Sequence, residues 1–247
     1  RVLLDIVDAL ASTLYEPEPL PVTARLWNPD GAFSRAVRAA VGEFAQLVGL
    51  DVESLPRLLP WHQPYFVFDP ERQAIFYPDV DGLPHEVAAF HVQFVGGNVT
   101  SACQALSALA PATVAHELVH ALREHAGLLT DDHWHEEYVA NRLAVGFLRG
   151  TDATRWEICR RLVRGACERG SRHLDETAHA ILLRSAEPAL AGGSPGLGSL
   201  TDYGVSLETS AAIHWQMVDQ LMDAEPSFEE DLAEYVGLRR QDELAAE

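Results

Sequence analysis

A pair of histidines with metal-ligand spacing lies near the middle of the chain, at His116 and His120, with Glu117 between them. On an α-helix, residues four apart share one face, whereas Glu117 lies about 100° round the axis from His116. Two imidazoles on one face can bind the same metal ion. Glu117 lies too far aside to join them easily, so it is predicted to act as the general base toward a metal-bound water.

A second polar segment supplies candidates for the third protein ligand that such a metal needs. A helix is predicted to begin with residues 131–144, with Asp131 or Asp132 as its N-cap and Gly150 beyond its end, because aspartate is a favoured N-cap and glycine a common helix stop. Glu137 and Asn141 are four residues apart and therefore share a face of this helix. Glu137 can ligate a metal through its carboxylate, and Asn141 can hold a ligating histidine in place by a hydrogen bond.

These two segments resemble the gluzincin branch of zinc metallopeptidases. The similarity lies in His-Glu-Leu-Val-His at 116–120 and in Glu-Tyr-Val-Ala-Asn-Arg-Leu-Ala at 137–144, which matches the E-x-x-A-N-x-x-A helix of small family members. The resemblance implies a zincin-like fold, zinc as the cofactor, a peptide or protein as the substrate, and hydrolysis by a zinc-activated water. The roles that it implies are zinc ligation by His116, His120 and Glu137, base catalysis by Glu117, and support of a ligand by Asn141.

The third ligand has alternatives, because the separation between His120 and Glu137 is shorter than the usual family spacing. Three neighbouring residues can replace Glu137 in this role: Glu136, His133 and His135. If one of these histidines closed the site as a fourth ligand, the metal would be structural. The chain would then be a non-catalytic module with a zincin-like scaffold.

A further catalytic residue is expected downstream, because zincins often stabilise the oxyanion with a later histidine or tyrosine. The resemblance makes His214 the candidate for this role. Tyr203, in the glycine-rich loop over residues 192–204, is the weaker candidate.

The same ligands also fit iron, since two histidines and one carboxylate form the facial triad of non-haem Fe(II) oxygenases. The alternative function is therefore a peptide-modifying hydroxylase that uses Fe(II) and 2-oxoglutarate. Such an enzyme needs an arginine for the 2-oxoglutarate carboxylate, and Arg142 is available.

A ferritin-like di-iron protein is a further alternative, because the chain contains two E-x-x-H pairs. The first pair is Glu117 and His120, and the second is Glu176 and His179. The remaining ligands of such a site would come from Glu136 or Glu137 and from Glu86.

Charge, cysteine content and apolar runs limit the classes of binding partner and the cellular location that we expect. The 247 residues include 37 acidic and 18 basic side chains, all of the latter arginine, for a formal net charge of −19. This charge argues against nucleic acid or an anionic membrane as partner. The cysteines, Cys103, Cys159 and Cys167, are odd in number and lack C-x-x-C spacing, which favours reduced thiols and a cytoplasmic location. No apolar run approaches the length of a membrane span, so we expect a soluble protein.

The apolar pattern predicts an α+β protein that is mostly helical, with a small antiparallel sheet before the metal-binding helix and a helical C-terminal half. The sheet is expected to contain a hairpin over 65–77 and a third strand over 90–95, after a turn over 55–59. The metal-binding helix is expected to start at Pro111, because proline suits the first helical position. Other helices are predicted over 2–14, 32–48, 100–110, 152–169, 172–186, 207–224 and 227–240, with caps at Asp30, Thr100 or Ser101, Thr151, Ser171, Ser206 and Ser227. Three parts follow: an N-terminal helical segment over 1–60, the catalytic core over 61–150 and a C-terminal helical part over 151–247.

Overall fold

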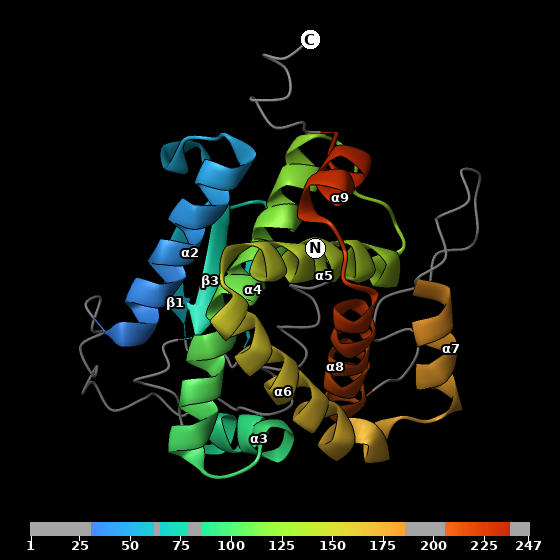
Figure 1. The fold of residues 1–247 in the computed structure, drawn as a ribbon. Helices are drawn as coiled ribbons and strands as arrows, with labels where there is room; N and C mark the ends of the chain where they lie inside the picture. Colours follow the sequence, from blue (N-terminus) through green and yellow to red (C-terminus); the bar gives the residue numbers. More distant parts are fainter. Residues whose placement is uncertain (1–30, 62–64, 79–84, 186–205, 238–247) are drawn as a thin grey trace.

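The computed structural model describes residues 31–61, 65–78, 85–185 and 206–237. Helix 2–14, the cap Asp30, the glycine-rich loop and Tyr203 lie outside these ranges. Within them the chain is mostly helical with one small sheet, as predicted (Figure 1). The helices are α2 (Ala32–Val48), α3 (His85–Val95), α4 (Val99–His125), α5 (His133–Thr151), α6 (Ala153–Gly170), α7 (Glu176–Ser185), α8 (Leu207–Ala224) and α9 (Phe228–Tyr235), with short 3-10 turns at Val52–Ser54 and Ser171–His173. None of the helices in these ranges is long and apolar enough to cross a membrane.

The sheet differs from the expected antiparallel one. It contains β1 (Arg57–Trp61), β2 (Val67–Asp69) and β3 (Ala74–Pro78) in the order β1-β3-β2. The hairpin of β2 and β3 is antiparallel as predicted, but β1 pairs with β3 in parallel. Residues 57–59, which were expected to lie in a turn, therefore belong to the first strand. Their hydrogen-bonding partner is β3, more than a dozen residues further along the chain, so local sequence did not indicate the pairing.

The expected third strand over 90–95 is wrong, because these residues form the end of α3. A short apolar run fits either a strand or a buried helix, and only its packing decides between them. Phe94 is buried in a small cluster with Ala166 of α6 and Ala212 of α8. This packing of three helices accounts for the helical outcome.

Helix α4 runs without a break through Pro111, so the prediction that this proline starts the metal-binding helix is also wrong. The helix begins at the Asn98 cap, whose side chain accepts a hydrogen bond from the Ser101 main-chain N–H. A proline in a helix interior costs about 3 kcal/mol or more. Burial of Ala110 and Val114 on either side of the proline offsets that cost through tertiary packing.

The remaining helix starts are set largely by local caps. Asp132 caps α5 as predicted, and Ser206 and Ser227 cap α8 and α9. Asp152, rather than the predicted Thr151, caps α6, since its carboxylate accepts hydrogen bonds from two main-chain N–H groups. Three other predicted boundaries shift: α5 includes Gly150, the helix expected over 172–186 is a 3-10 turn followed by α7, and α9 ends at Tyr235.

Two large hydrophobic clusters hold the elements together. One joins α2, the sheet, α4, α5 and α9. Its centre includes Phe44, whose ring lies 5.6 Å from that of Phe147 and 5.8 Å from that of Phe228. The other joins α5, α6, α7 and α8. Because α5 contributes to both clusters, its position is fixed from two sides, and this helix carries Glu137 and Asn141.

Candidate metal centre

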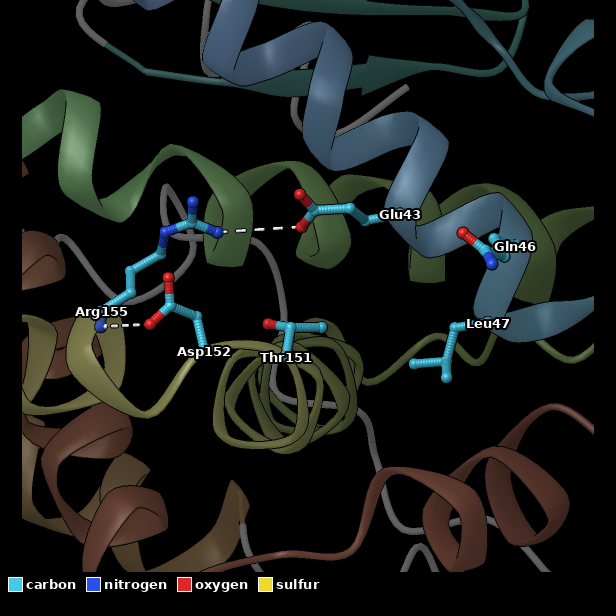
Figure 2. A pocket seen from close by; sticks show the side chains of 6 residues that line it. All are labelled: Glu43, Gln46, Leu47, Thr151, Asp152 and Arg155. Carbon is cyan, nitrogen blue, oxygen red and sulfur yellow. Dashed lines mark hydrogen bonds and ion pairs between the residues drawn. The ribbon is translucent and has the colours of Figure 1, made fainter.

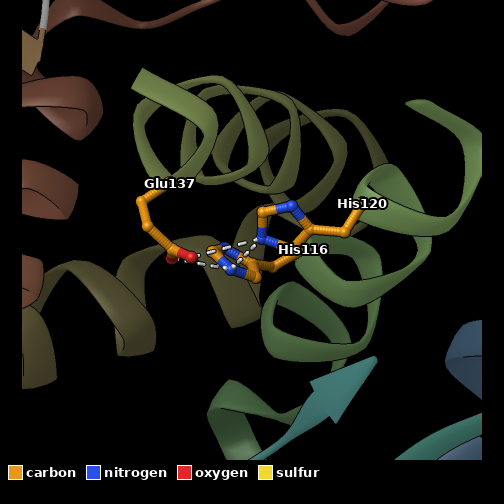
Figure 3. Close-up of side chains that lie close together, drawn as sticks. All are labelled: His116, His120 and Glu137. Atoms are coloured by element: carbon orange, nitrogen blue, oxygen red, sulfur yellow. Dashed lines mark hydrogen bonds and ion pairs between the residues drawn. The ribbon is translucent and has the colours of Figure 1, made fainter. Parts of the chain in front are cut away.

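Three predicted ligands come together between α4 and α5. The Nε2 atoms of His116 and His120 lie 3.0 Å apart. The Glu137 carboxylate lies 3.2 Å from the first nitrogen and 3.5 Å from the second. Figure 3 shows the two rings and the carboxylate converging on one point. These three residues could hold a metal ion, because their ligand atoms all lie within 4.8 Å of one another. Together His116, His120 and Glu137 form the metal group.

The spacing of these atoms suits a small cation. Two ligands that each lie about 2.0–2.1 Å from a tetrahedral zinc are roughly 3.3 Å apart. The separations of 3.0, 3.2 and 3.5 Å, of which the last two end on different oxygens of Glu137, fall on both sides of that value. Two nitrogens and one carboxylate oxygen are also a donor set that zinc and Fe(II) both accept.

The same three side chains are strongly coupled by charge. Burial alone lowers the pKa of His116, but the Glu137 carboxylate, together with Glu117 and Asn141, outweighs this effect and raises that pKa to about 9. Burial raises the pKa of Glu137, whereas the His116 and His120 imidazoles hold it well below its usual range. Without metal, the group therefore contains a His116–Glu137 ion pair at neutral pH. Binding of a cation must displace the proton of this pair.

Asn141, one turn beyond Glu137 on α5, contacts the other side of His116. Its Oδ1 lies 3.0 Å from His116 Nδ1. This contact leaves Nε2 as the atom that faces the other ligands. The structure thus places Asn141 where the supporting role was expected.

Glu117 lies beside the group but is not one of its three members. It is buried, and its Oε2 accepts a hydrogen bond of 2.7 Å from the main-chain N–H of Phe68 in β2. Burial is the main effect that raises the pKa of the Glu117 carboxyl, and the nearby imidazoles oppose it. The sequence did not indicate the Phe68 contact, because it joins residues 49 positions apart.

Glu136 takes a different role from the ligand role left open for it. Its carboxylate forms a two-point ion pair with Arg123, at 2.8 Å for each contact, and it accepts a hydrogen bond from the Thr130 N–H. Arg123 also donates to the carbonyls of Leu128 and Tyr235. Removing one partner of such a buried pair costs about 3–5 kcal/mol. Glu136 is therefore committed to joining α4, α5 and α9, which leaves Glu137 as the carboxylate of the metal group.

Two further histidines approach Glu137. His133 Nδ1 lies 3.8 Å from Oε1, and His214 Nδ1 lies 3.7 Å from Oε2. The Trp134 ring contacts both imidazoles, at 5.3 and 5.4 Å between ring centroids. Burial lowers the pKa of His214 to about 4, so this imidazole is neutral at neutral pH. His135 is buried and does not join the group.

The residues that the two alternative functions need in addition to this group do not join it in the described part of the structure. Glu176 and His179 are exposed on α7 and are not part of the metal group. The Glu86 side chain lies outside the described part of the structure. Arg142 donates to Asp231 at 2.9 Å, so its guanidinium is engaged in an ion pair between α5 and α9.

A surface cavity of about 380 Å³ lies away from the metal group and shares no residue with it (Figure 2). It is where α2 meets the junction of α5 and α6. Arg155 and Glu43 form an ion pair of 3.7 Å across it, and Asp152 serves as the α6 cap. The charged groups of this cavity are thus used within the fold.

Comparison of the chain with protein-family models, with curated proteins and with solved structures found no match. The candidate metal centre therefore rests on its own geometry.

Proposed function

We propose that this chain is a zinc-dependent hydrolase of the HExxH metallopeptidase type, with a zincin-like arrangement of its two central helices. The observation that carries the proposal is the convergence of His116, His120 and Glu137 beside Glu117. Glu117 is a buried carboxylate that is not one of the three ligands and has a separate anchor on β2. Three ligands and an adjacent free base are the parts that hydrolysis of a peptide or amide bond requires.

Zinc, when bound by these three ligands, would polarise the scissile carbonyl and lower the pKa of a coordinated water to about 7. Glu117 accepts the proton of the attacking water and delivers it to the leaving amine. In the metal-free group, burial raises the pKa of this carboxyl, and a carboxyl with a raised pKa is better suited to proton transfer in both directions near neutral pH. The Phe68 N–H keeps one carboxylate oxygen in place and leaves the other for the water.

His214 is proposed to donate a hydrogen bond to the developing oxyanion. It is neutral because burial lowers its pKa to about 4, so it can donate one N–H without adding charge to the site. Its position 3.7 Å from Glu137 puts it at the edge of the metal group, on a helix separate from both ligand helices. Trp134 supports the ring by contact at 5.4 Å between centroids.

The iron-dependent hydroxylase is the second candidate, since its facial triad has the same donors. One observation weighs against it. Arg142, the arginine proposed for the 2-oxoglutarate carboxylate, is paired with Asp231 at 2.9 Å. A bound carboxylate would have to compete with this ion pair.

The deciding experiment measures zinc and iron content in chain purified anaerobically without chelators, beside His120→Ala and Glu117→Gln. We expect one zinc per chain, its loss in His120→Ala, and its retention in Glu117→Gln. Glu117→Gln keeps an oxygen that can accept the Phe68 N–H bond but has no base. Cleavage of a peptide library, followed by mass spectrometry, should therefore fall by about 10²–10⁴-fold in this variant.

Other outcomes distinguish the alternatives. Iron in place of zinc, with oxygen and 2-oxoglutarate consumed, would establish the hydroxylase. Normal turnover by Glu117→Gln would overturn the assigned base, and absence of metal from the wild-type chain would overturn the proposed function.

A further inference from the structure

The metal group is supported from behind by a residue of α8 that the motifs did not indicate. The Asn141 side-chain amide, which contacts His116 through its oxygen, donates from Nδ2 to the sulfur of Met217 at 3.3 Å. Both partners are buried, with exposed fractions of 7% for Asn141 and 2% for Met217. The contact therefore joins His116, Asn141 and Met217 in one row inside the protein.

The Met217 sulfur favours one of the two orientations of the Asn141 amide. A thioether sulfur accepts hydrogen bonds weakly and cannot donate one. Met217 can therefore satisfy only the NH₂ end of the Asn141 amide, which turns the carbonyl end toward His116. With the amide reversed, its oxygen would face the sulfur, so that two buried acceptors would meet without a proton between them.

The direction of the amide decides which nitrogen of His116 is free. A carbonyl oxygen 3.0 Å from Nδ1 accepts a proton from that atom. The neutral ring then carries its proton on Nδ1 and has its lone pair on Nε2, the atom that faces His120 and Glu137. The reversed amide would donate to Nδ1 and favour a proton on Nε2, which cannot then bind a metal.

We propose that Met217 is a positioning residue for the metal centre: it sets the orientation of the Asn141 amide and, through it, the metal-binding tautomer of His116. This inference rests on the metal binding of the proposed function. Met217 lies one turn from His214 on α8, so one helix contributes both the histidine beside Glu137 and the sulfur behind Asn141.

The test compares zinc affinities by competition with a chromophoric chelator. Met217→Leu removes the sulfur and nearly conserves the volume. Its matched control is Met222→Leu, because Met222 lies on the same helix, is also 2% exposed and packs in the same hydrophobic cluster. We expect the control to bind zinc like the wild type and Met217→Leu to lose about tenfold, the low end of the range for residues that orient ligands.

A double-mutant cycle separates positioning from packing. Asn141→Asp gives the side chain two oxygens and no donor, so neither orientation can turn a donor toward His116 Nδ1. One oxygen then faces the sulfur, so removal of the sulfur in this background also removes a contact between two acceptors. Adding Met217→Leu to Asn141→Asp should cause no further loss of zinc affinity. A purely structural role would give the same loss in both backgrounds and would overturn the proposal.

A second substitution avoids a change of shape. The sequence has two methionines, so norleucine incorporated into Met222→Leu replaces, of these two, Met217 alone, with a methylene in place of sulfur. It should show the same loss as Met217→Leu. Unchanged affinity in both would overturn the role of Met217 while the metal site stands, whereas failure of the wild-type chain to bind zinc would overturn the proposed function and this inference together.

Discussion

His116 and Glu137 hold the metal group together before any cation arrives. The imidazolium and the carboxylate lie 3.2 Å apart and stabilise each other's charged forms, which is why their pKa values shift in opposite directions. An ion pair of this kind preorganises the ligands, but it also makes the proton of His116 a competitor of the metal. The proposed metal affinity of this group should therefore depend on pH.

This competition predicts how zinc affinity changes with pH. The pKa of His116 is about 9 without metal, so at lower pH each binding event must release one proton from this ring. The apparent affinity should therefore rise about tenfold per pH unit between about pH 6 and about pH 8 and level off above about pH 9. Chelator competition measures this slope, and calorimetry in buffers of different ionisation enthalpy counts the proton. An affinity that is flat over this range would contradict the ion pair.

Among the helices, α5 sets the geometry of the site because it packs on both sides. Arg123 and Glu136 join it to the end of α4, and Arg142 and Asp231 join it to α9. In addition to these ion pairs, α5 packs closely against Phe228 at the start of α9. The smallest residue of α5 at that contact is Gly146.

A matched pair of glycines on α5 tests this close approach. A Cβ at Gly146 would lie 3.0 Å from the main-chain nitrogen of Phe228, whereas a Cβ at Gly150 has no neighbour within 4 Å. Gly146→Ala should destabilise the fold by about 1–3 kcal/mol through overpacking. Gly150→Ala should stabilise it by roughly 0.5–1 kcal/mol, because alanine has less chain entropy to lose in a helix.

Urea unfolding of the two variants and the wild type gives both values. Equal free energies of unfolding for Gly146→Ala and Gly150→Ala would contradict the close packing of α9 against α5 at Gly146.

For the chain as a whole, the excess of acidic residues opposes compaction. A net charge of −19 repels itself in the folded state. Exposed ion pairs such as Arg149–Glu225, with side chains 41% and 52% exposed, act in the opposite direction but contribute only about 0.2–1 kcal/mol each. The repulsion should therefore dominate the response of stability to salt.

Screening tests this balance. Between about 0.01 M and about 0.15 M ionic strength the Debye length falls from about 30 Å to about 8 Å. The thermal midpoint of the chain should rise over this interval, by about 2–4 °C for each kcal/mol of repulsion that is screened. Tetramethylammonium chloride is the matched control for sodium chloride, because its bulky cation does not enter a metal site. A midpoint that falls with both salts would mean that the ion pairs outweigh the net charge.

Several features were predictable because they depend on residues close together in the sequence. His116 and His120 share a helix face whatever surrounds them, and Asp132 caps the helix that follows it. Mostly helical content followed from apolar spacing for the same reason. The pairing of β1 with β3 and the helical state of residues 90–95 were not predictable, because their hydrogen bonds and packing involve distant partners.

The sequence thus established that two imidazoles and a nearby carboxylate were available on two successive helices. Folding selected among the carboxylates: Arg123 binds Glu136, and Glu137 is left for the imidazoles. Folding also brought residues of β2 and α8 to the site, where the Phe68 N–H holds Glu117 and Met217 contacts Asn141. The reason is physical: helical spacing is a local property of the backbone, whereas desolvation and the pairing of buried polar groups depend on which segments pack together.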